Sequence, residues 1–191
     1  MSGAASHARP VGSSARPAVF LDRDGVINRA EVRHGIPHPP ASLRDLSILP
    51  RVPEALSLLK ADGYALIVVT NQPDVARGTA SLESVALIHA RLQAGLALDA
   101  ILTCFHDGTD ACDCRKPEPG LLLHAAEAFN IDLSSSFMVG DRWRDIEAGR
   151  RAGCRTIWID CGYLEQQAVN YHFRVESLAE AAAIIRGRTE P

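Results

Sequence analysis

The sequence lacks an uninterrupted apolar stretch of the roughly 20 residues that a membrane-spanning helix needs. It also lacks a basic excess, because 20 Lys and Arg residues are outnumbered by 23 Asp and Glu residues and the formal net charge is -3. A protein with this charge has no cationic surplus to neutralise the phosphates of a nucleic acid. These two absences predict a soluble globular protein whose partner is neither a membrane nor a nucleic acid.

Acidic residues are absent from residues 1–17, a segment of mainly Ser, Ala, Gly, Pro, Arg and His with almost no large apolar side chain. This composition predicts a disordered tail, although acid-free segments with Arg and Ser also occur in organelle transit peptides. A secretory signal would need an apolar core, which this segment lacks, so a cytoplasmic protein is expected. Residues 18–191 are long enough to form a single domain with its own core, and we expect a monomer.

Short apolar runs alternate with amphipathic segments along the rest of the chain. Strands are predicted at 18–21, 65–69, 101–103, 136–139 and 156–159. Helices are predicted at 52–59, 82–92, 119–129, 144–151 and 178–185, from apolar residues at helical spacing. This alternation predicts an α/β fold with a doubly wound, mainly parallel sheet and helices on both faces. The proline-rich segment 29–44 is predicted to be a long surface loop.

The strand predicted at 18–21 ends in two acids, Asp22 and Asp24, and the chain can turn at Gly25. Side chains two residues apart on a strand point the same way, so both carboxylates are predicted to face one spot beyond the strand. Ligands of open α/β sheets bind there. Two carboxylates repel each other unless a cation separates them, and Mg2+ takes oxygen ligands of this kind. Ordinary turn acids are the alternative interpretation.

Polar side chains also follow two other predicted strands, with Thr70 and Asn71 after the second strand and Asp141 after the fourth. Parallel strands bring their carboxyl ends to one edge of a sheet, so these side chains are expected near Asp22 and Asp24. The predicted Mg2+ shell consists of Asp22, Asp141 and either the side chain or the main-chain carbonyl of Asp24.

Such a site suits phosphoryl transfer, which depends on positioning and on charge neutralisation. Thr70, Asn71 and Lys116 supply hydroxyl, amide and ammonium donors for the oxygens of a phosphoryl group. Asp22 is predicted to attack phosphorus and form an aspartyl phosphate. Asp24 is predicted to protonate the leaving oxygen and then to activate water.

Four soft or borderline metal ligands lie within eleven residues: Cys104, His106, Cys112 and Cys114. Tetrahedral Zn2+ accepts a set of three Cys and one His, and four protein ligands leave no open position, so a structural zinc site is predicted. A disulfide is the first alternative, but Cys-x-Cys neighbours bridge each other poorly and no secretory signal is recognised. Free thiols are the second alternative.

Four motifs follow one another in this chain: Asp22-x-Asp24-Gly25-Val26, Thr70-Asn71-Gln72, Lys116-Pro117 and Gly140-Asp141-x-x-x-Asp145. The series resembles that of the haloacid dehalogenase superfamily, across roughly residues 18–160. The resemblance implies a phosphatase with Asp22 as the nucleophile, Asp24 as the acid/base and Asp141 on Mg2+. It also implies that Thr70 and Lys116 hold the phosphoryl group. Asp145 is either an outer metal ligand or an exposed acid in the first turn of a helix.

The series Cys-x-His-x5-Cys-x-Cys-Arg-Lys-Pro narrows the resemblance to the branch that contains the heptose bisphosphate phosphatases and the histidinol phosphatases. The opening Asp-Arg-Asp-Gly-Val-Ile-Asn and the pair His34-Gly35 favour the heptose enzymes. The resemblance implies a small phosphorylated sugar as the substrate, a D-glycero-D-manno-heptose 1,7-bisphosphate that loses its 7-phosphate. It further implies that Arg115 contacts the second phosphate. Arg33, His34 and His38 lie in the segment 29–44, where any of them could touch a substrate, and His34 is the one expected there.

Three features depart from the pattern of that branch. Pro73-Asp74 stands where the heptose enzymes have Ser-Gly, Arg142 replaces a lysine, and the segment between Asn28 and Val52 is longer and richer in proline. Once the helices are placed, the spacings from Asp24 to Thr70 and from Asn71 to Lys116 leave no room for a separate cap domain, so an open site is expected. Histidinol phosphate and polynucleotide 3'-phosphate ends remain alternative substrates. A non-catalytic zinc-loop module that binds a partner is the alternative outside the enzymes.

Overall fold

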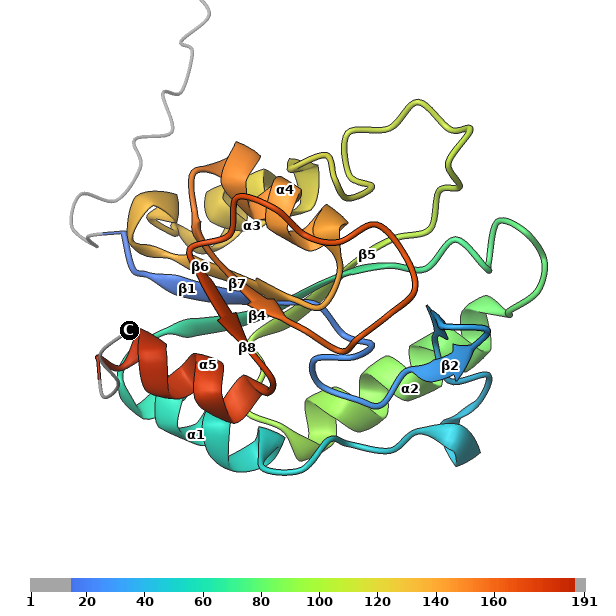
Figure 1. Cartoon of the computed structure of the whole chain (residues 1–191), viewed down its shortest axis with the longest axis horizontal. Helices are drawn as coiled ribbons and strands as arrows, with labels where there is room; N and C mark the ends of the chain where they lie inside the picture. The colour runs from blue at the N-terminus through green and yellow to red at the C-terminus, as the bar shows by residue number, and fades with distance from the viewer. Residues whose placement is uncertain (1–14, 188–191) are drawn as a thin grey trace, which may run out of the picture.

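In a computed structural model, which describes residues 15–187, six strands form one parallel sheet in the order β5-β4-β1-β6-β7-β8 (Figure 1). The strands are β1 (Ala18–Leu21), β4 (Ala65–Asn71), β5 (Ala100–Cys104), β6 (Phe137–Gly140), β7 (Arg155–Ile159) and β8 (Phe173–Val175). The helices are α1 (Val52–Ala61), α2 (Leu82–Gly95), α3 (Gly120–Phe129), α4 (Trp143–Ala152) and α5 (Leu178–Ile185). Two 3-10 turns, η1 (Leu43–Asp45) and η2 (Leu133–Ser135), lie in the connections.

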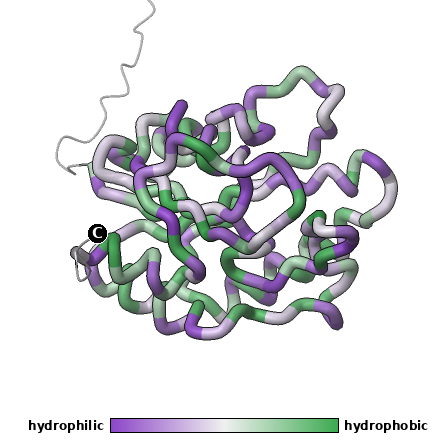
Figure 2. Tube along the Cα trace, viewed as in Figure 1, coloured by the Kyte–Doolittle hydropathy of each residue, from purple (hydrophilic) through white to green (hydrophobic). Residues whose placement is uncertain are grey.

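Side chains of β1 alternate between the two faces of the sheet, as the two-residue period of a strand requires. Val19 and Leu21 belong to a core cluster with α1, α2 and α5, whereas Ala18 and Phe20 pack with α3 and α4 on the opposite face. Figure 2 shows hydrophobic residues interspersed with hydrophilic ones along the chain, and the buried residues of α1 and α5 are all apolar. The predicted α/β sheet with helices on both faces is confirmed.

The five strands and five helices expected from the sequence are all present, with small shifts at their ends. β8 is an additional strand at the edge of the sheet, paired with β7. It has only three residues, Phe173–Val175, and a run of this length is too short to show an alternating pattern.

The segment 29–44 contains a small antiparallel hairpin, so the prediction of a long loop is wrong over this part. β2 (Glu31–Arg33) pairs with β3 (Ile36–His38), and the turn consists of His34 and Gly35 with φ angles of 52° and 78°. A two-residue turn with both φ angles positive matches the twist of antiparallel strands. Pro37 fits into β3 because a two-stranded hairpin leaves one edge of each strand unpaired.

The parallel register brings the carboxyl ends of β1, β4, β5 and β6 to one edge of the sheet. Leu21 at the end of β1 pairs with Val68 and Val139, and Asn71 at the end of β4 pairs with Cys104. The predicted acids and the cysteine-containing loop therefore share this edge. No cap domain is inserted within the part of the chain that the structure describes, where the hairpin and the loop between β5 and α3 are among the connections that lie at this edge.

Residues 1–14 of the predicted tail lie outside the described residues. Arg16, also placed in the tail by the prediction, donates its main-chain N–H to the Asn130 carbonyl at 3.1 Å and accepts from the Asp132 N–H at 3.0 Å. Main-chain pairing with the rest of the fold thus begins before the predicted boundary. Among the helices of residues 15–187, none combines the length and the apolar character needed to cross a membrane.

Candidate active site

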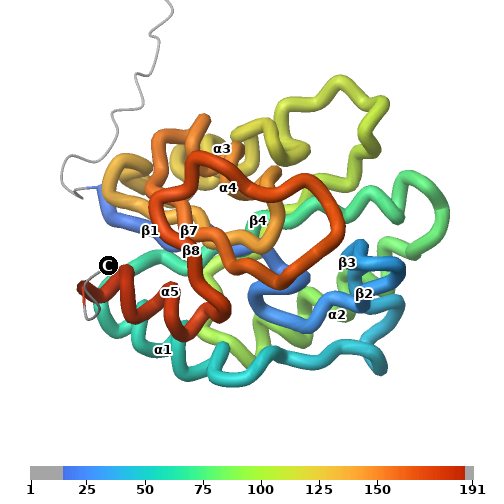
Figure 3. The backbone as a smooth tube through the Cα atoms, in the orientation of Figure 1, coloured from blue at the N-terminus to red at the C-terminus, as the bar shows by residue number. Residues whose placement is uncertain are grey.

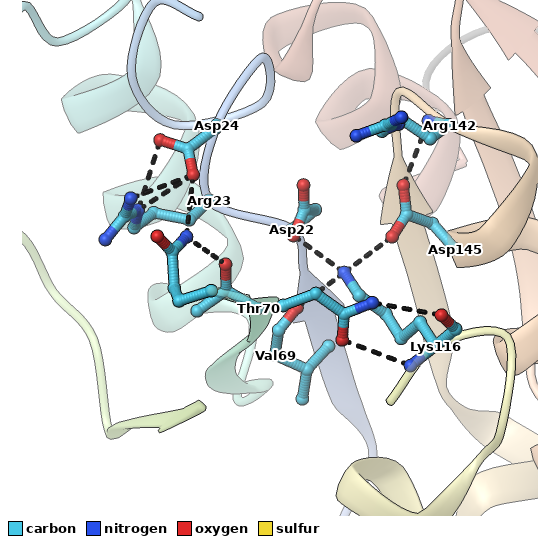
Figure 4. Close-up of polar contacts among 10 residues, drawn as sticks. Asp22, Arg23, Asp24, Val69, Thr70, Lys116, Arg142 and Asp145 are labelled. Carbon is cyan, nitrogen blue, oxygen red and sulfur yellow. Dashed lines mark hydrogen bonds and ion pairs between the residues drawn. The ribbon is translucent and has the colours of Figure 1, made fainter. Parts of the chain in front are cut away.

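The ammonium group of Lys116 lies at the centre of a buried ion cluster beyond the carboxyl end of β1 (Figure 4). Its Nζ donates to Asp22 Oδ1 at 2.6 Å and to the Val69 carbonyl at 2.7 Å, and it lies 2.5 Å from Asp145 Oδ1. An ammonium group has three N–H donors, so all of them are used. Burial by itself lowers the pKa of Lys116, but the carboxylates of Asp145 and Asp22 outweigh burial and raise the pKa above its ordinary value. Lys116 is therefore a fixed positive charge.

Asn71 holds the main chain of Lys116 in place. Its Nδ2 donates to the Lys116 carbonyl at 3.0 Å, and its Oδ1 accepts from the Lys116 N–H at 3.1 Å. Thr70 is buried one residue earlier on β4, and its hydroxyl oxygen accepts a 2.9 Å hydrogen bond from Gln72 Nε2. The structure thus brings both predicted phosphate-binding residues to the site, and it engages both side chains with protein partners.

Asp22 follows β1 and is only 7% exposed. Its main-chain N–H donates to the Val139 carbonyl of β6 at 3.0 Å, which ties it to the neighbouring strand. Burial raises the pKa of its carboxyl group to about 6, against the lowering effect of Lys116, and the carboxylates of Asp145 and Asp24 add to the increase. The main-chain bond to β6 and the contact with Lys116 therefore fix the position of Asp22, the predicted nucleophile.

Asp141 follows β6 and completes a cluster of three buried carboxylates with Asp22 and Asp145, in which one oxygen of each lies within 4.8 Å of the others. Neither oxygen of Asp141 makes a well-formed hydrogen bond with the described residues, although the Tyr163 hydroxyl is close by. Burial, followed by the charges of Asp22 and Asp145, raises the pKa of Asp141 well above its ordinary value. Three carboxylates share one ammonium group here. A hard divalent cation with oxygen ligands fits this donor set.

Asp145 lies in the first turn of α4 and is 2% exposed, so the alternative of an exposed acid is wrong. Its Oδ2 accepts a 2.9 Å hydrogen bond from the Arg142 N–H, while its Oδ1 contacts Lys116. The carboxylate therefore caps α4 and joins this helix to the ion cluster. Both of its oxygens are engaged, which suits an outer position around a metal better than a direct one.

Two glycines leave room for these carboxylates. Gly25 has a φ angle of +92°, and a Cβ atom at this position would lie 1.9 Å from Asp141 Oδ2. A Cβ atom on Gly140 would lie 2.1 Å from Asp145 Cβ. Both separations are far shorter than the roughly 3.5 to 4 Å of a favourable carbon contact. Any larger residue at either position would displace a carboxylate of the cluster.

Asp24 belongs to a separate hydrogen-bond network that points away from Lys116 (Figure 4). Its Oδ1 accepts from Asn28 Nδ2 and its Oδ2 accepts from Gln72 Nε2, both at 2.9 Å, and the guanidinium group of Arg23 contacts both oxygens. Asp22 and Asp24, which the sequence predicts to lie together, thus have different hydrogen-bond partners.

The prediction that the side chains of Asp22 and Asp24 face one spot holds only in part, because both line one cavity but their carboxylates have different partners. β1 ends at Leu21, and the chain turns directly afterwards, with the Gly25 N–H donating to the Asn28 carbonyl at 2.7 Å. The two-residue period of a strand does not extend into such a turn. The carboxylate of Asp24 lies outside the cluster of metal-capable acids, so its main-chain carbonyl is the predicted metal contact that remains.

A cavity of about 240 Å³ opens above the cluster and is lined by both Asp22 and Asp24. One wall comes from β3 and its continuation, including His38, and another from the loop after β4, including Asp74. His34 does not line the cavity, in contrast to the prediction that it lies at the substrate, because it occupies the turn of the hairpin. His38, at the end of β3, is the histidine that lines the cavity.

Four arginines line the mouth of the cavity: Arg77, Arg115, Arg142 and Arg144. Arg142 pairs with Glu165, and Arg77 pairs with Asp107. Arg115 Nη1 donates to the His106 carbonyl at 3.0 Å.

Arg144 differs from these three, because within residues 15–187 its guanidinium group packs over the ring of Trp143, 4.9 Å away, and forms no ion pair with a carboxylate. Burial lowers the pKa of Arg144, and Arg142 and Arg115 are among the neighbouring charges that do so as well. The carboxylates of Glu165 and Asp145 oppose this lowering, so the cavity mouth holds a half-buried cation near charges of both signs.

The cysteine-containing loop gathers the predicted zinc ligands Cys104, His106, Cys112 and Cys114, whose ligand atoms all lie within 4.8 Å of one another. Cys104 Sγ lies 3.1 Å from Cys114 Sγ and 3.9 Å from Cys112 Sγ. His106 Nδ1 lies 3.3 Å from Cys114 Sγ. A disulfide bond is about 2 Å long, and all five cysteines are free, so the disulfide alternative is not found. The spacing suits four ligands around one metal ion.

Three residues at the site carry no clear signal in the sequence. The only signal for Arg23 is its position between two acids that follow a strand. His89 has the pattern of an ordinary surface residue of α2. Glu165 reaches Arg142 from the loop between β7 and β8, which Figure 3 traces in red-orange. The same loop is joined to the hairpin through the Leu164 N–H, which donates to the Gly35 carbonyl at 2.8 Å. Contacts of such long range leave no trace in local spacing.

Saturating Mg2+ should raise the melting temperature of the protein, because a divalent cation relieves the repulsion among the buried carboxylates. At a hundredfold excess over the dissociation constant, we expect an increase of about 5 to 10 °C. In Asp141→Asn this increase should largely disappear, whereas Asp24→Asn, whose carboxylate lies outside the cluster, should retain it. Thermal denaturation with and without Mg2+ measures the effect. An equal increase in wild type and Asp141→Asn would contradict the assignment.

The chain is similar to known phosphatases over most of its length. A family model described as "HAD-hyrolase-like" matches residues 113–181. A D-glycero-beta-D-manno-heptose-1,7-bisphosphate 7-phosphatase of Pasteurella multocida is 36% identical over 186 residues, which cover 90% of this chain and 98% of the relative. The enzyme of the same name from Photorhabdus laumondii is 42% identical over 148 residues, which cover 71% of this chain and 76% of the relative.

The structural comparison agrees with the sequence comparison. The crystal structure of the D,D-heptose 1,7-bisphosphate phosphatase of B. bronchiseptica, in complex with magnesium and phosphate, superposes with a TM-score of 0.78 at 29% identity. The match covers 91% of this chain and 99% of that chain. The resemblance to the haloacid dehalogenase (HAD) superfamily is therefore confirmed, and this chain belongs to the D-glycero-beta-D-manno-heptose-1,7-bisphosphate 7-phosphatase family of HAD-like phosphatases.

Proposed function

We propose that this protein is a Mg2+-dependent phosphatase that removes the 7-phosphate of a D-glycero-D-manno-heptose 1,7-bisphosphate. The observation that carries the proposal is the buried cluster of Asp22, Asp141 and Asp145 around Lys116, at the bottom of a sugar-sized cavity with arginines at its mouth. The relatives of the same family are named for this reaction. The five free cysteines agree with a reducing compartment such as the cytoplasm.

In this proposal Asp22 is the nucleophile. Lys116 holds one carboxylate oxygen, and the other attacks phosphorus, so that a bond forms from Asp22 to phosphorus as the ester bond breaks. The leaving sugar oxygen takes a proton from Asp24. Water then attacks the aspartyl phosphate and gives its proton to Asp24, which releases inorganic phosphate and restores both acids.

Asp22, Asp141 and the main-chain carbonyl of Asp24 would hold the Mg2+ ion, with Asp145 outside them. When bound, Mg2+ neutralises the charge of the phosphoryl oxygens and of the nucleophile, which otherwise repel each other. The chain itself supplies the positive charge of Lys116 and the hydroxyl of Thr70 for the same oxygens. Burial of these groups strengthens their attraction for the transferred phosphoryl group.

The arginines at the mouth of the cavity support a substrate with a second phosphate. Arg115, Arg142 and Arg144 lie close enough to influence one another, and Arg144 has no carboxylate partner within the described part of the chain. A second phosphate would supply the missing negative charge. Histidinol phosphate carries a cationic ammonium group at the corresponding end, which these arginines would repel. The charge of the cavity mouth therefore favours a sugar bisphosphate.

We also infer that the cluster of Cys104, His106, Cys112 and Cys114 binds structural Zn2+. Four protein ligands would close the coordination shell. The metal would fix the loop that carries Arg115 and Lys116, since Arg115 donates to the carbonyl of the ligand His106.

Asp22→Asn should lower kcat by at least about 10³-fold while the melting temperature changes little, because the amide has the same shape but cannot attack phosphorus. A panel of phosphate monoesters, including heptose 1,7-bisphosphate and histidinol phosphate, measures activity and preference together. Wild-type protein should prefer the heptose bisphosphate. Undiminished activity of Asp22→Asn would refute the role of Asp22, and a preference for histidinol phosphate would refute the substrate.

Arg144→Ala should raise KM for heptose 1,7-bisphosphate by about 10- to 100-fold, the effect of losing a hydrogen bond to a charged group. The KM for a simple aryl monophosphate should stay unchanged, because it has no second phosphate. Arg150→Ala is the matched control, since Arg150 lies on the same helix but pairs with Glu147 outside the cavity. An equal change of KM for both substrates would contradict a role in binding the second phosphate.

Metal analysis of the purified protein should find one Zn2+ ion per chain. Cys112→Ser should lose this ion and lower the melting temperature, because the free energy of metal binding contributes to folding. Cys161→Ser, at a cysteine outside the cluster, should retain the ion. Full zinc content in Cys112→Ser would contradict the inferred ligand set.

A further inference from the structure

Arg23 is a charged side chain with no exposed surface, located between Asp22 and Asp24. Its Nε lies 3.1 Å from both carboxylate oxygens of Asp24, and its Nη2 donates to Asp24 Oδ2 at 2.9 Å (Figure 4). Its Nη1 lies 2.9 Å from His89 Nε2. A buried guanidinium group is costly unless its donors are paired, and Arg23 achieves this with one acid and one histidine. It therefore connects α2 to Asp24.

His89 is half-buried on α2 and contacts Arg23 with its Nε2 atom. Burial, together with the nearby charge of Arg23, lowers the pKa of His89 to about 4. The ring is therefore neutral near pH 7, and a neutral imidazole nitrogen can accept a hydrogen bond from Arg23. This contact fixes Nη1 of the guanidinium group, and Nε and Nη2 of the same group then face Asp24.

The carboxylate of Asp24 has two further partners, the amide groups of Asn28 and Gln72. Both are neutral donors that meet one oxygen each, whereas Arg23 meets both oxygens. Arg23 therefore fixes the rotation of the carboxylate group together with the two amides, and it is the one of these three partners that carries a charge. Asp24 itself lines the cavity, so its rotation decides where its proton lies relative to the ester oxygen of a bound substrate.

We propose that Arg23 and His89 are positioning residues for proton transfer: His89 orients Arg23, and Arg23 holds Asp24 at the angle at which it exchanges protons with the ester oxygen and with water. The inference rests on the proposed function, since it takes Asp24 as the acid/base. Neither residue touches the substrate or changes the sequence of bonds that form and break. His89 acts on the reaction from a helix through two hydrogen-bonded side chains.

The test compares an alkyl phosphate, such as heptose 1,7-bisphosphate, with p-nitrophenyl phosphate. An alkyl oxygen needs a proton to leave, whereas nitrophenolate leaves without one. The value of kcat/KM covers the steps up to loss of the leaving group, so the ratio of kcat/KM between the two substrates reports proton donation by Asp24. A purely structural role of His89 would lower both values together and leave the ratio unchanged.

We expect His89→Leu to lower the alkyl-to-aryl ratio by about 10-fold, part of the about 10²- to 10⁴-fold effect of general acid catalysis. His89→Gln, whose amide oxygen can accept from Arg23, should largely restore the ratio. His124→Leu is the control, because His124 is an exposed histidine on α3. If His89→Leu does not fold, His89→Met, which fills the same space with a flexible apolar side chain, takes its place.

Asp24→Asn distinguishes a failure of the acid/base role of Asp24 from a failure of the positioning role of Arg23 and His89. If Asp24→Asn leaves the ratio unchanged, the acid/base role in the proposed function is wrong. If Asp24→Asn lowers the ratio but the variants of His89 leave it at the wild-type value, the proposed function stands and the positioning role of Arg23 and His89 is overturned.

Discussion

The burial of one ammonium group between two carboxylates is the interaction on which the rest of the site depends. Lys116 binds Asp22 after β1, the Val69 carbonyl on β4 and Asp145 on α4. Removal of one partner from a buried ion pair costs about 3 to 5 kcal/mol, because a charge is left unpaired in a medium of low polarity. Each of these buried charges is therefore unfavourable until its partner from a distant segment of the chain is in place.

The two acids of the first motif have different surroundings, and this separates their chemistry. Asp22 is attached to Lys116 and to the other carboxylates of the cluster, whereas Asp24 is surrounded by Arg23, Asn28 and Gln72. Pairs of acids in distinct environments are a common way to divide the roles of nucleophile and proton carrier. In this chain the sharp turn after β1 produces the separation, since it rotates Asp24 out of the alternation of the strand.

The walls of the cavity come from connections between the sheet elements instead of a separate cap domain. The hairpin β2-β3, the loop after β4 and the cysteine-containing loop surround the cavity, and Arg77 links the last two through its ion pair with Asp107. The loop between β7 and β8 supports the hairpin through Leu164 and supports Arg142 through Glu165. Such walls confine a ligand by charge and shape while the mouth stays open.

The sequence by itself determined the order of strands and helices, the acids at the strand ends and the ligand spacing of the cysteine-containing loop. These features depend on local periodicity and on the parallel register, which short segments express directly. The tertiary structure alone decided the rotation of Asp24, the burial of Asp145, the place of His38 instead of His34 in the cavity, and the contact of His89 with Arg23. The physical reason is that side-chain direction beyond a strand end, and the burial of a polar group, depend on packing between distant segments, which no local pattern records.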